Sequence, residues 1–282
     1  MKQRVLVAVF GIPLILAIVV LAPDWATAVA LAVLCVIGAH ELLNAVCGGE
    51  KARRWFGLAG AMAVFTMLMV YCGDGRFDHT ALPALAKVFL AAMVVLVFVC
   101  AVVEYGTEHP LTFVDICTIF VSGIAIPLAL GCLLRLRMLP YGSGLVLIPM
   151  VAAFCSDSAA LFAGMAFGKH KLAPKVSPKK TVEGAIGGLV GGMVGMIIFR
   201  IVFYLCTVHP LHIGWCVLIG LVGAAMGQLG DLSFSVIKRQ TGIKDYGNLI
   251  PGHGGVLDRF DSILAVAPLI EALLLIMPVV IL

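Results

Sequence analysis

Apolar runs of about 20 residues recur along the whole chain, and this repetition limits the folds that the chain can adopt. Each run is long enough to cross ~30 Å of hydrocarbon as a helix. Of the 282 residues, 62% are hydrophobic and 12% are charged, whereas a soluble domain has about a quarter of its residues charged. An isolated strand would leave backbone polar groups unpaired in lipid, and the sequence lacks the short alternating segments of a membrane barrel. The sequence therefore predicts an all-α polytopic membrane protein.

About nine of these runs are expected to be transmembrane helices. Turn residues or charges separate them, and they fall near 5–22, 26–43, 56–72, 82–104, 111–134, 144–168, 182–206, 212–237 and 260–281. The first run follows Lys2 and Arg4 like a signal peptide, but it exceeds the usual ~7–15-residue signal core, so we expect an uncleaved span. We divide the chain into amino-terminal helices at 1–140, which are spans one to five, and a catalytic region at 141–282, which is spans six to nine.

The basic residues are distributed unevenly between the two sides of the membrane. With nine spans, fourteen Lys and Arg residues fall on the side of the amino terminus and four on the other. Cytoplasmic loops carry the excess of basic residues in membrane proteins. We therefore expect a multi-pass protein of the cell membrane, with the amino terminus and both polar loops of the carboxy-terminal half in the cytoplasm.

One polar stretch, residues 235–261, concentrates ionisable groups between two apolar runs. Because charge near hydrocarbon is costly, the stretch is predicted to bind a polar ligand. Asp231 lies ~10 Å deeper along its helix than Lys238, and Asp258 opens the last span together with Asp261. Asp231 and Asp258 would then approach one depth from two antiparallel helices, as a divalent metal site requires. The alternative is that each carboxylate pairs with a nearby base.

Basic and glycine-rich segments surround these carboxylates and predict phosphate binding. Arg offers a bidentate fork and Lys a point charge for phosphate. Glycines allow the backbone N–H groups to come close to an anion and bind it. His253, within Pro251-Gly252-His253-Gly254-Gly255, could bind phosphate or transfer a proton, or make a structural hydrogen bond. By contrast, we interpret His40-Glu41 as a satisfied polar pair. The glycine ladders at 184–195 favour tight helix packing or a dimer contact, with a cavity wall as the alternative.

The combined pattern resembles a known family. The residues Ser235-x-x-Lys238-Arg239-x4-Lys244-Asp245-x-Gly247-x2-Ile250-Pro251-x-His253-Gly254-Gly255-x-x-Asp258-Arg259-Phe260-Asp261 look like the signature of phosphatidate cytidylyltransferase, also called CDP-diacylglycerol synthase. The block Ser177-Pro178-Lys179-Lys180-Thr181-x-Glu183-Gly184 is similar to the family as well. The resemblance covers about residues 150–265. In span six the family often has Asn-Asp-x-x-Ala-Tyr, where this chain has Ser156-Asp157-Ser158-Ala159-Ala160-Leu161.

This resemblance implies an enzyme of phospholipid biosynthesis that transfers CMP from CTP to phosphatidic acid, giving CDP-diacylglycerol and pyrophosphate. It also implies Mg²⁺ bound by Asp231 and Asp258, a monovalent cation such as K⁺ nearby, and a homodimer in the bilayer; no nucleic-acid partner is expected. Alternative functions are a CTP-dependent lipid-alcohol kinase and, less favoured because the acids gather at one face, a transporter.

The candidate site lies at the cytoplasmic rim of the carboxy-terminal helices. The expected catalytic residues are Asp231, Asp258, Lys238, Arg239 and His253. Further metal candidates are Asp261 and Asp157. The nucleotide and phosphate contacts are expected from Ser177, Lys179, Lys180, Thr181, Ser235, Lys244, Gly254, Gly255 and Arg259.

Overall fold

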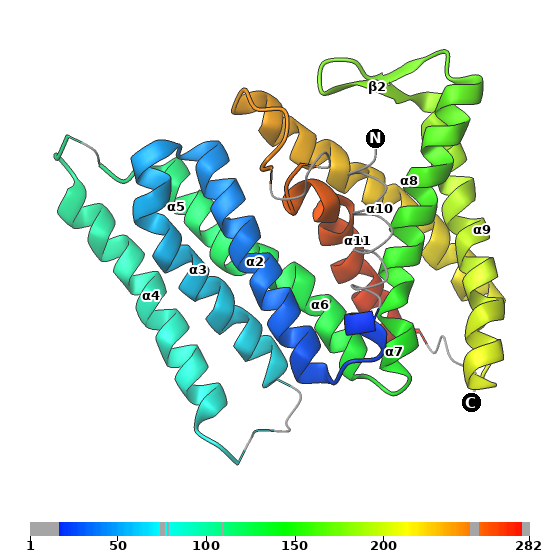
Figure 1. The fold of residues 1–282 in the computed structure, drawn as a ribbon, viewed down its shortest axis with the longest axis horizontal. Coiled ribbons are helices and arrows are strands. Elements are labelled where there is room, and N and C mark those ends of the chain that lie inside the picture. The colour runs from blue at the N-terminus through cyan, green and yellow to red at the C-terminus, as the bar shows by residue number, and fades with distance from the viewer. Residues whose placement is uncertain (1–16, 74–76, 78, 109, 249–253, 278–282) are drawn as a thin grey trace. The chain divides into compact units, whose positions relative to one another are not determined.

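The computed structural model describes residues 17–73, 77, 79–108, 110–248 and 254–277, and most of them are helical (Figure 1). The predicted all-α fold is confirmed, with one short β-hairpin added. The elements in chain order are α2 (Asp24–Val46), α3 (Gly49–Tyr71), α4 (Leu82–Glu104), α5 (Phe113–Phe120), η1 (Val121–Ala125), α6 (Ile126–Met138), α7 (Gly142–Leu145), α8 (Leu147–Phe167), β1 (Lys171–Ala173), β2 (Ser177–Thr181), α9 (Val182–Thr207), α10 (Ile213–Gln240) and α11 (Leu257–Ile276).

Seven helical segments of the described residues are long and apolar enough to cross a membrane. They are Asp24–Val46, Gly49–Tyr71, Leu82–Glu104, Phe113–Met138, Gly142–Phe167, Val182–Thr207 and Ile213–Gln240. These segments match the second to eighth predicted spans. Most of the first predicted span lies outside the described residues, and the ninth corresponds to α11, which is helical but is not one of the seven. The total of nine therefore stays a prediction.

The chain forms two compact units. The first unit comprises Met1–Arg135 and Ile243–Asp258, and the second comprises Leu136–Gly242 and Arg259–Leu282. The polar stretch 235–261 thus contributes to both units, since its middle part belongs with the amino-terminal helices. The functional boundary predicted at residue 140 stays a prediction.

The first unit buries a core between α2, α3, α4 and α5. Its largest members include Leu43, Trp55, Met62, Val97 and Ile119. Helix α4 is apolar along its length, yet only 11% of its most apolar window is buried inside the protein. An exposed apolar helix of this length is stable in lipid rather than in water, so α4 supports the membrane setting directly.

A π-helical turn, η1, joins α5 to α6 within one membrane span. Pro127 follows this turn and lacks an N–H group, so it cannot donate the helical hydrogen bond to the carbonyl of Gly123. The hydroxyl of Thr66 on α3 donates to that carbonyl instead, at 3.0 Å. A side chain of a neighbouring helix therefore satisfies the backbone group that the proline frees, as burial in lipid requires.

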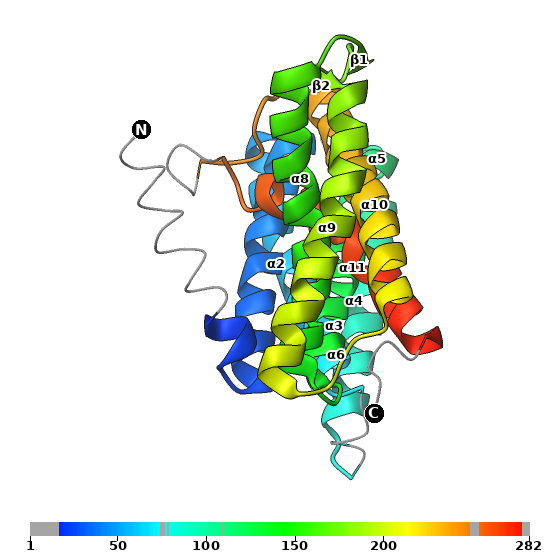
Figure 2. The same cartoon turned by 90° about the vertical axis from the view of Figure 1, so that its right-hand side faces the viewer.

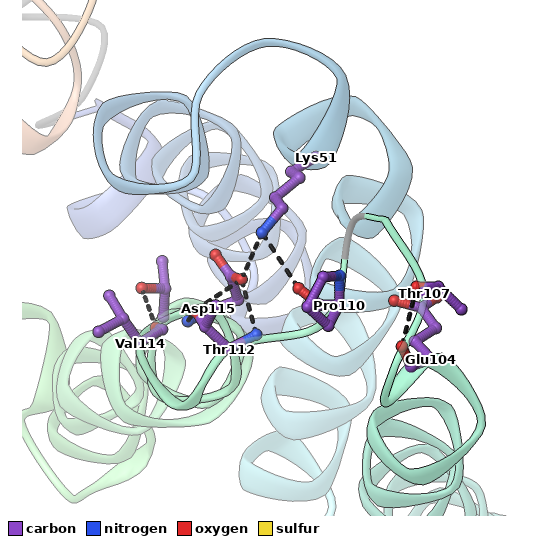
Figure 3. Close-up of polar contacts among 8 residues, drawn as sticks. Lys51, Glu104, Thr107, Pro110, Thr112, Val114 and Asp115 are labelled. Atoms are coloured by element: carbon purple, nitrogen blue, oxygen red, sulfur yellow. Dashed lines mark hydrogen bonds and ion pairs between the residues drawn. The ribbon is translucent and has the colours of Figure 1, made fainter.

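A polar network ties the start of α3 to the connection between α4 and α5 (Figure 3). The Lys51 ammonium donates to the Asp115 carboxylate and to the Pro110 carbonyl, each at 3.1 Å. Thr112 and Asp115 form a reciprocal capping box that begins α5. Burial raises the pKa of the nearby Cys47 thiol to about 12, with a further contribution from Asp115, so this thiol stays neutral.

In the second unit, α8 and α9 run side by side with the β1–β2 hairpin at one end of the pair (Figures 1 and 2). The glycine ladders of α9 allow this close approach. A Cβ atom at Gly187 or Gly191 would overlap Ala163 or Ala159 of α8, and one at Gly192 would lie 2.6 Å from the Gly220 carbonyl of α10. The glycines between residues 184 and 195 therefore pack against α8 and α10 of the same chain, which favours the packing interpretation over a cavity wall.

Gly191→Ala is expected to lower the melting temperature in detergent by several degrees, because the new methyl group forces α8 and α9 apart and overpacking destabilises by about 1–3 kcal/mol. Gly57→Ala in α3 is the matched control, since no atom lies within 4 Å of a Cβ built there. That control should keep or raise the melting temperature, as Ala is the better helix former. Equal melting temperatures for the two variants would contradict the close packing of α8 on α9.

Candidate active site

The second unit brings a lysine from the hairpin against a carboxylate on α10. The Lys180 ammonium lies 2.5 Å from Oδ2 of Asp231, and the Ser235 hydroxyl donates to Oδ1 at 3.3 Å. The local sequence explains the position of Lys180: Thr181 caps α9 by accepting from the Gly184 N–H at 3.1 Å, which ends β2 at the start of the helix. Both side chains of the pair are about a quarter to a third exposed, so a ligand can reach them.

Two further carboxylates lie near this pair. The Ser262 hydroxyl on α11 donates to Oδ2 of Asp157 on α8 at 3.3 Å, and the Ser262 N–H donates to Oδ1 of Asp261 at 2.7 Å. The charge of Asp231 acts on both Asp157 and Asp261. Three carboxylates from three apolar helices thus share one region, where like charges repel strongly unless cations accompany them.

The hairpin that carries Lys180 is fixed at both ends. Its strands are antiparallel, with Lys171 opposite Thr181, and the Glu183 carboxylate holds the start of the hairpin through His170, with a 2.6 Å contact to Nδ1. At the other end, Arg239 Nε donates to the Val176 carbonyl at 3.0 Å. The sequence predicted only a basic loop here, so the defined hairpin and its attachment to α10 are new.

The first unit contains the glycine-rich part of the polar stretch. Oδ2 of Asp258 accepts from the Tyr246 N–H at 2.8 Å and from the Gly255 N–H at 3.0 Å. Gly254 has φ +83°, a left-handed conformation that favours glycine. The side chain of Asp258 therefore closes its own loop, and this arrangement fixes where its carboxylate lies within the unit.

A buried acid that was not predicted as a site residue also holds this loop. Oε1 of Glu41 on α2 accepts from the Val256 N–H and Oε2 from the Leu257 N–H, both at 2.8 Å. Glu41 is 4% exposed. In the sequence Glu41 is an acid inside an apolar run. Its two partners lie 215 and 216 residues further along the chain, so no local pattern identifies them. The interpretation of His40-Glu41 as a polar pair does not describe these contacts, because Glu41 binds the loop and His40 contacts Asn44.

The predicted site residues are divided between the two units. The first unit holds Lys244, Gly254, Gly255 and Asp258, and His253 lies outside the described residues. Because Asp231 and Asp258 belong to different units, their joint ligation of one metal ion stays a prediction. The second unit holds Asp157, Ser177, Lys179, Lys180, Thr181, Asp231, Ser235, Lys238, Arg239, Arg259 and Asp261.

The donor atoms have the chemistry that a hard divalent cation needs. Carboxylate and hydroxyl oxygens are the ligands of Mg²⁺, which usually takes one or two carboxylates and completes its shell with water and substrate phosphates. Across the described residues, no three His, Cys, Asp or Glu side chains form a ready metal site. The carboxylates of Asp157, Asp231 and Asp261 and the Ser235 hydroxyl are oxygen donors of the kind that such an ion takes.

The sequence matches the cytidylyltransferase family over residues 2–277. The chain belongs to this family. The phosphatidate cytidylyltransferase of Haemophilus influenzae is 33% identical over 284 residues, which cover 95% of this chain and 96% of that protein. The Staphylococcus haemolyticus enzyme of the same name is 29% identical over 98% of this chain and 99% of its own length. The Pseudomonas aeruginosa enzyme is 43% identical over 50% of this chain and 51% of its own length.

The family match reaches well beyond residues 150–265, which carried the resemblance in the sequence. It includes the amino-terminal helices, to which no function was assigned from the sequence. Glu41 belongs to that part of the chain, so the contact between α2 and the glycine-rich loop lies inside the matched region.

Proposed function

We propose that this chain is a phosphatidate cytidylyltransferase, which makes CDP-diacylglycerol from CTP and phosphatidic acid. The observation that carries the proposal is the Lys180–Asp231 pair with two further carboxylates on apolar helices. A lipid phosphate can reach such a site while its acyl chains stay in the bilayer. The relatives that share nearly the whole chain carry the same name.

In this reaction a phosphate oxygen of phosphatidic acid attacks the α-phosphorus of CTP. The new P–O bond joins CMP to the lipid, and the bond from the α-phosphorus to the bridging oxygen breaks, so pyrophosphate leaves. No protein nucleophile is needed, because catalysis rests on positioning two polyanions and neutralising their charge.

We propose that Mg²⁺, with a monovalent cation such as K⁺ nearby, is the cofactor, and that Asp231 and Asp258 hold Mg²⁺. When bound, Mg²⁺ would stabilise the charge that develops on the phosphates. Lys180 would exchange its contact with Asp231 for one with a CTP phosphate, which its partial exposure allows. Lys238 and Arg239, in the last turn of α10, would add positive charge beside the leaving pyrophosphate.

The proposal also covers the setting of the enzyme. The excess of Lys and Arg on the side of the amino terminus supports a cytoplasmic site, where CTP is available. We further propose a homodimer. The glycine ladders of α9 are not the surface proposed for the contact between the two protomers, because they pack inside one protomer.

Product analysis tests the proposed function against the kinase alternative. Purified protein is incubated with CTP and Mg²⁺ and with either phosphatidic acid or diacylglycerol. The lipid products are then identified by mass spectrometry. A CDP-lipid formed only from phosphatidic acid is the expected product. A monophosphorylated lipid formed from diacylglycerol, with CDP released, would contradict the proposal and support the kinase.

A further inference from the structure

The carboxylate of Glu41 is placed to control the backbone of a distant loop. Glu41 is 4% exposed, and burying a carboxylate is unfavourable unless hydrogen bonds compensate for lost water. Here each oxygen accepts one backbone N–H, from Val256 and from Leu257, at 2.8 Å. These N–H groups are at the start of α11, where helical donors have no partner within the helix and where negative charge is favoured.

The loop is shaped to receive this acid. A Cβ atom at Gly255 would lie 2.5 Å from both Glu41 oxygens, and one at Gly247 would lie 2.7 Å from Oε1. Any side chain at either position would push the acid away from the backbone. The two glycines therefore fit around Glu41, in addition to any contact that they make with phosphate.

Asp258 follows directly after the two residues that Glu41 holds. Its own Oδ2 accepts from the N–H groups of Tyr246 and Gly255, which belong to the same loop. Glu41 and Asp258 thus bind four backbone N–H groups of one short segment, Ile243–Asp258, and the position of the Asp258 carboxylate depends on both sets of contacts.

We propose that Glu41 is a positioning residue, which acts through the backbone of Val256 and Leu257 to set the direction of the Asp258 side chain. The proposal rests on the proposed function, because it assigns Glu41 a part in the reaction through Asp258. It extends the site to α2, a helix for which the sequence predicted no functional role. This role requires no contact between Glu41 and the substrate.

The variant Glu41→Gln tests this role. The amide keeps the size of the side chain but replaces one acceptor oxygen with a donor that faces a backbone N–H. Hydrogen–deuterium exchange of the amides at 254–258 should then become about tenfold faster. The value of kcat should fall about 10- to 100-fold, because a small displacement of a catalytic group is enough for such a loss, while KM for CTP should change less than about threefold.

Glu104→Gln is the matched control, since Glu104 is a buried acid of the same unit whose partner is Arg54 at 2.6 Å. It should leave exchange at 254–258 and kcat unchanged. If Glu41→Gln does not fold, Gly247→Ala disturbs the same contact from the loop side and should give the same pattern.

Unchanged exchange at 254–258, or faster exchange without a loss of kcat, would overturn the proposal. An equal loss of kcat in Glu104→Gln would overturn it too, because the effect would then be general destabilisation. If the wild-type protein forms no CDP-lipid, the proposed function fails, and the exchange comparison still decides whether Glu41 holds the loop.

Discussion

Asp231→Asn should lower the formation of CDP-diacylglycerol at least about 100-fold, the order of loss expected when a charge that stabilises phosphoryl transfer is removed. The substitution takes a carboxylate from the group that Asp231 forms with Asp157 and Asp261. It also leaves the Lys180 ammonium, now 2.5 Å from Asp231, without its partner. Because Asp231 is partly exposed, the neutral amide should be tolerated, and the melting temperature in detergent should change little.

Two companion variants separate the carboxylate from the ion pair. Lys180→Met breaks the same pair but keeps Asp231. It should raise KM for CTP about tenfold, raise KM for the lipid less, and leave kcat at saturating CTP unchanged. Ser233→Ala, two residues along α10, removes an exposed hydroxyl that donates to the Leu229 carbonyl of the same helix, and it should leave activity unchanged. Near-normal activity of Asp231→Asn at any Mg²⁺ concentration would show that the metal assignment is wrong.

Asp258→Asn is expected to have an equally large effect on turnover for a different structural reason. The asparagine carbonyl can still accept from the N–H groups of Tyr246 and Gly255, which now bind Oδ2 of Asp258. The loop should therefore keep its conformation while the site loses one negative charge. We expect a loss of at least about 100-fold in turnover and unchanged hydrogen exchange at 254–258.

The control for this variant is Glu50→Gln, which neutralises an exposed acid in the first turn of α3 in the same unit. It should keep full activity. If Asp258→Asn is inactive only because the loop exchanges faster, then Asp258 is a structural residue and its predicted role at the metal is contradicted.

The membrane helices could be predicted from the sequence because hydropathy acts over about 20 residues and needs no knowledge of tertiary contacts. The segment at 82–104 shows this, since the predicted span coincides with α4 at Leu82–Glu104. Turn and charge signals placed most of the other boundaries within a few residues of the helices observed.

The missed features depend on contacts between distant residues. The hairpin at Lys171–Thr181 has strands of only three and five residues with no apolar alternation, so local propensity does not reveal it. Glu41 reaches a loop 215 residues away, and the acid alone does not indicate its partners. Charge patterning and the family resemblance together located the candidate residues, and the structure supplied the contacts of Lys180 and Asp258.

Transfer of label from CTP tests the central proposal most directly. Purified protein is given phosphatidic acid, Mg²⁺ and CTP that carries ³²P at either the α- or the γ-phosphate, with Asp258→Asn as the inactive comparison. We expect the α-label to enter the lipid and the γ-label to appear only in pyrophosphate. Entry of the γ-label into lipid, or equal α-labelling by Asp258→Asn, would contradict the account.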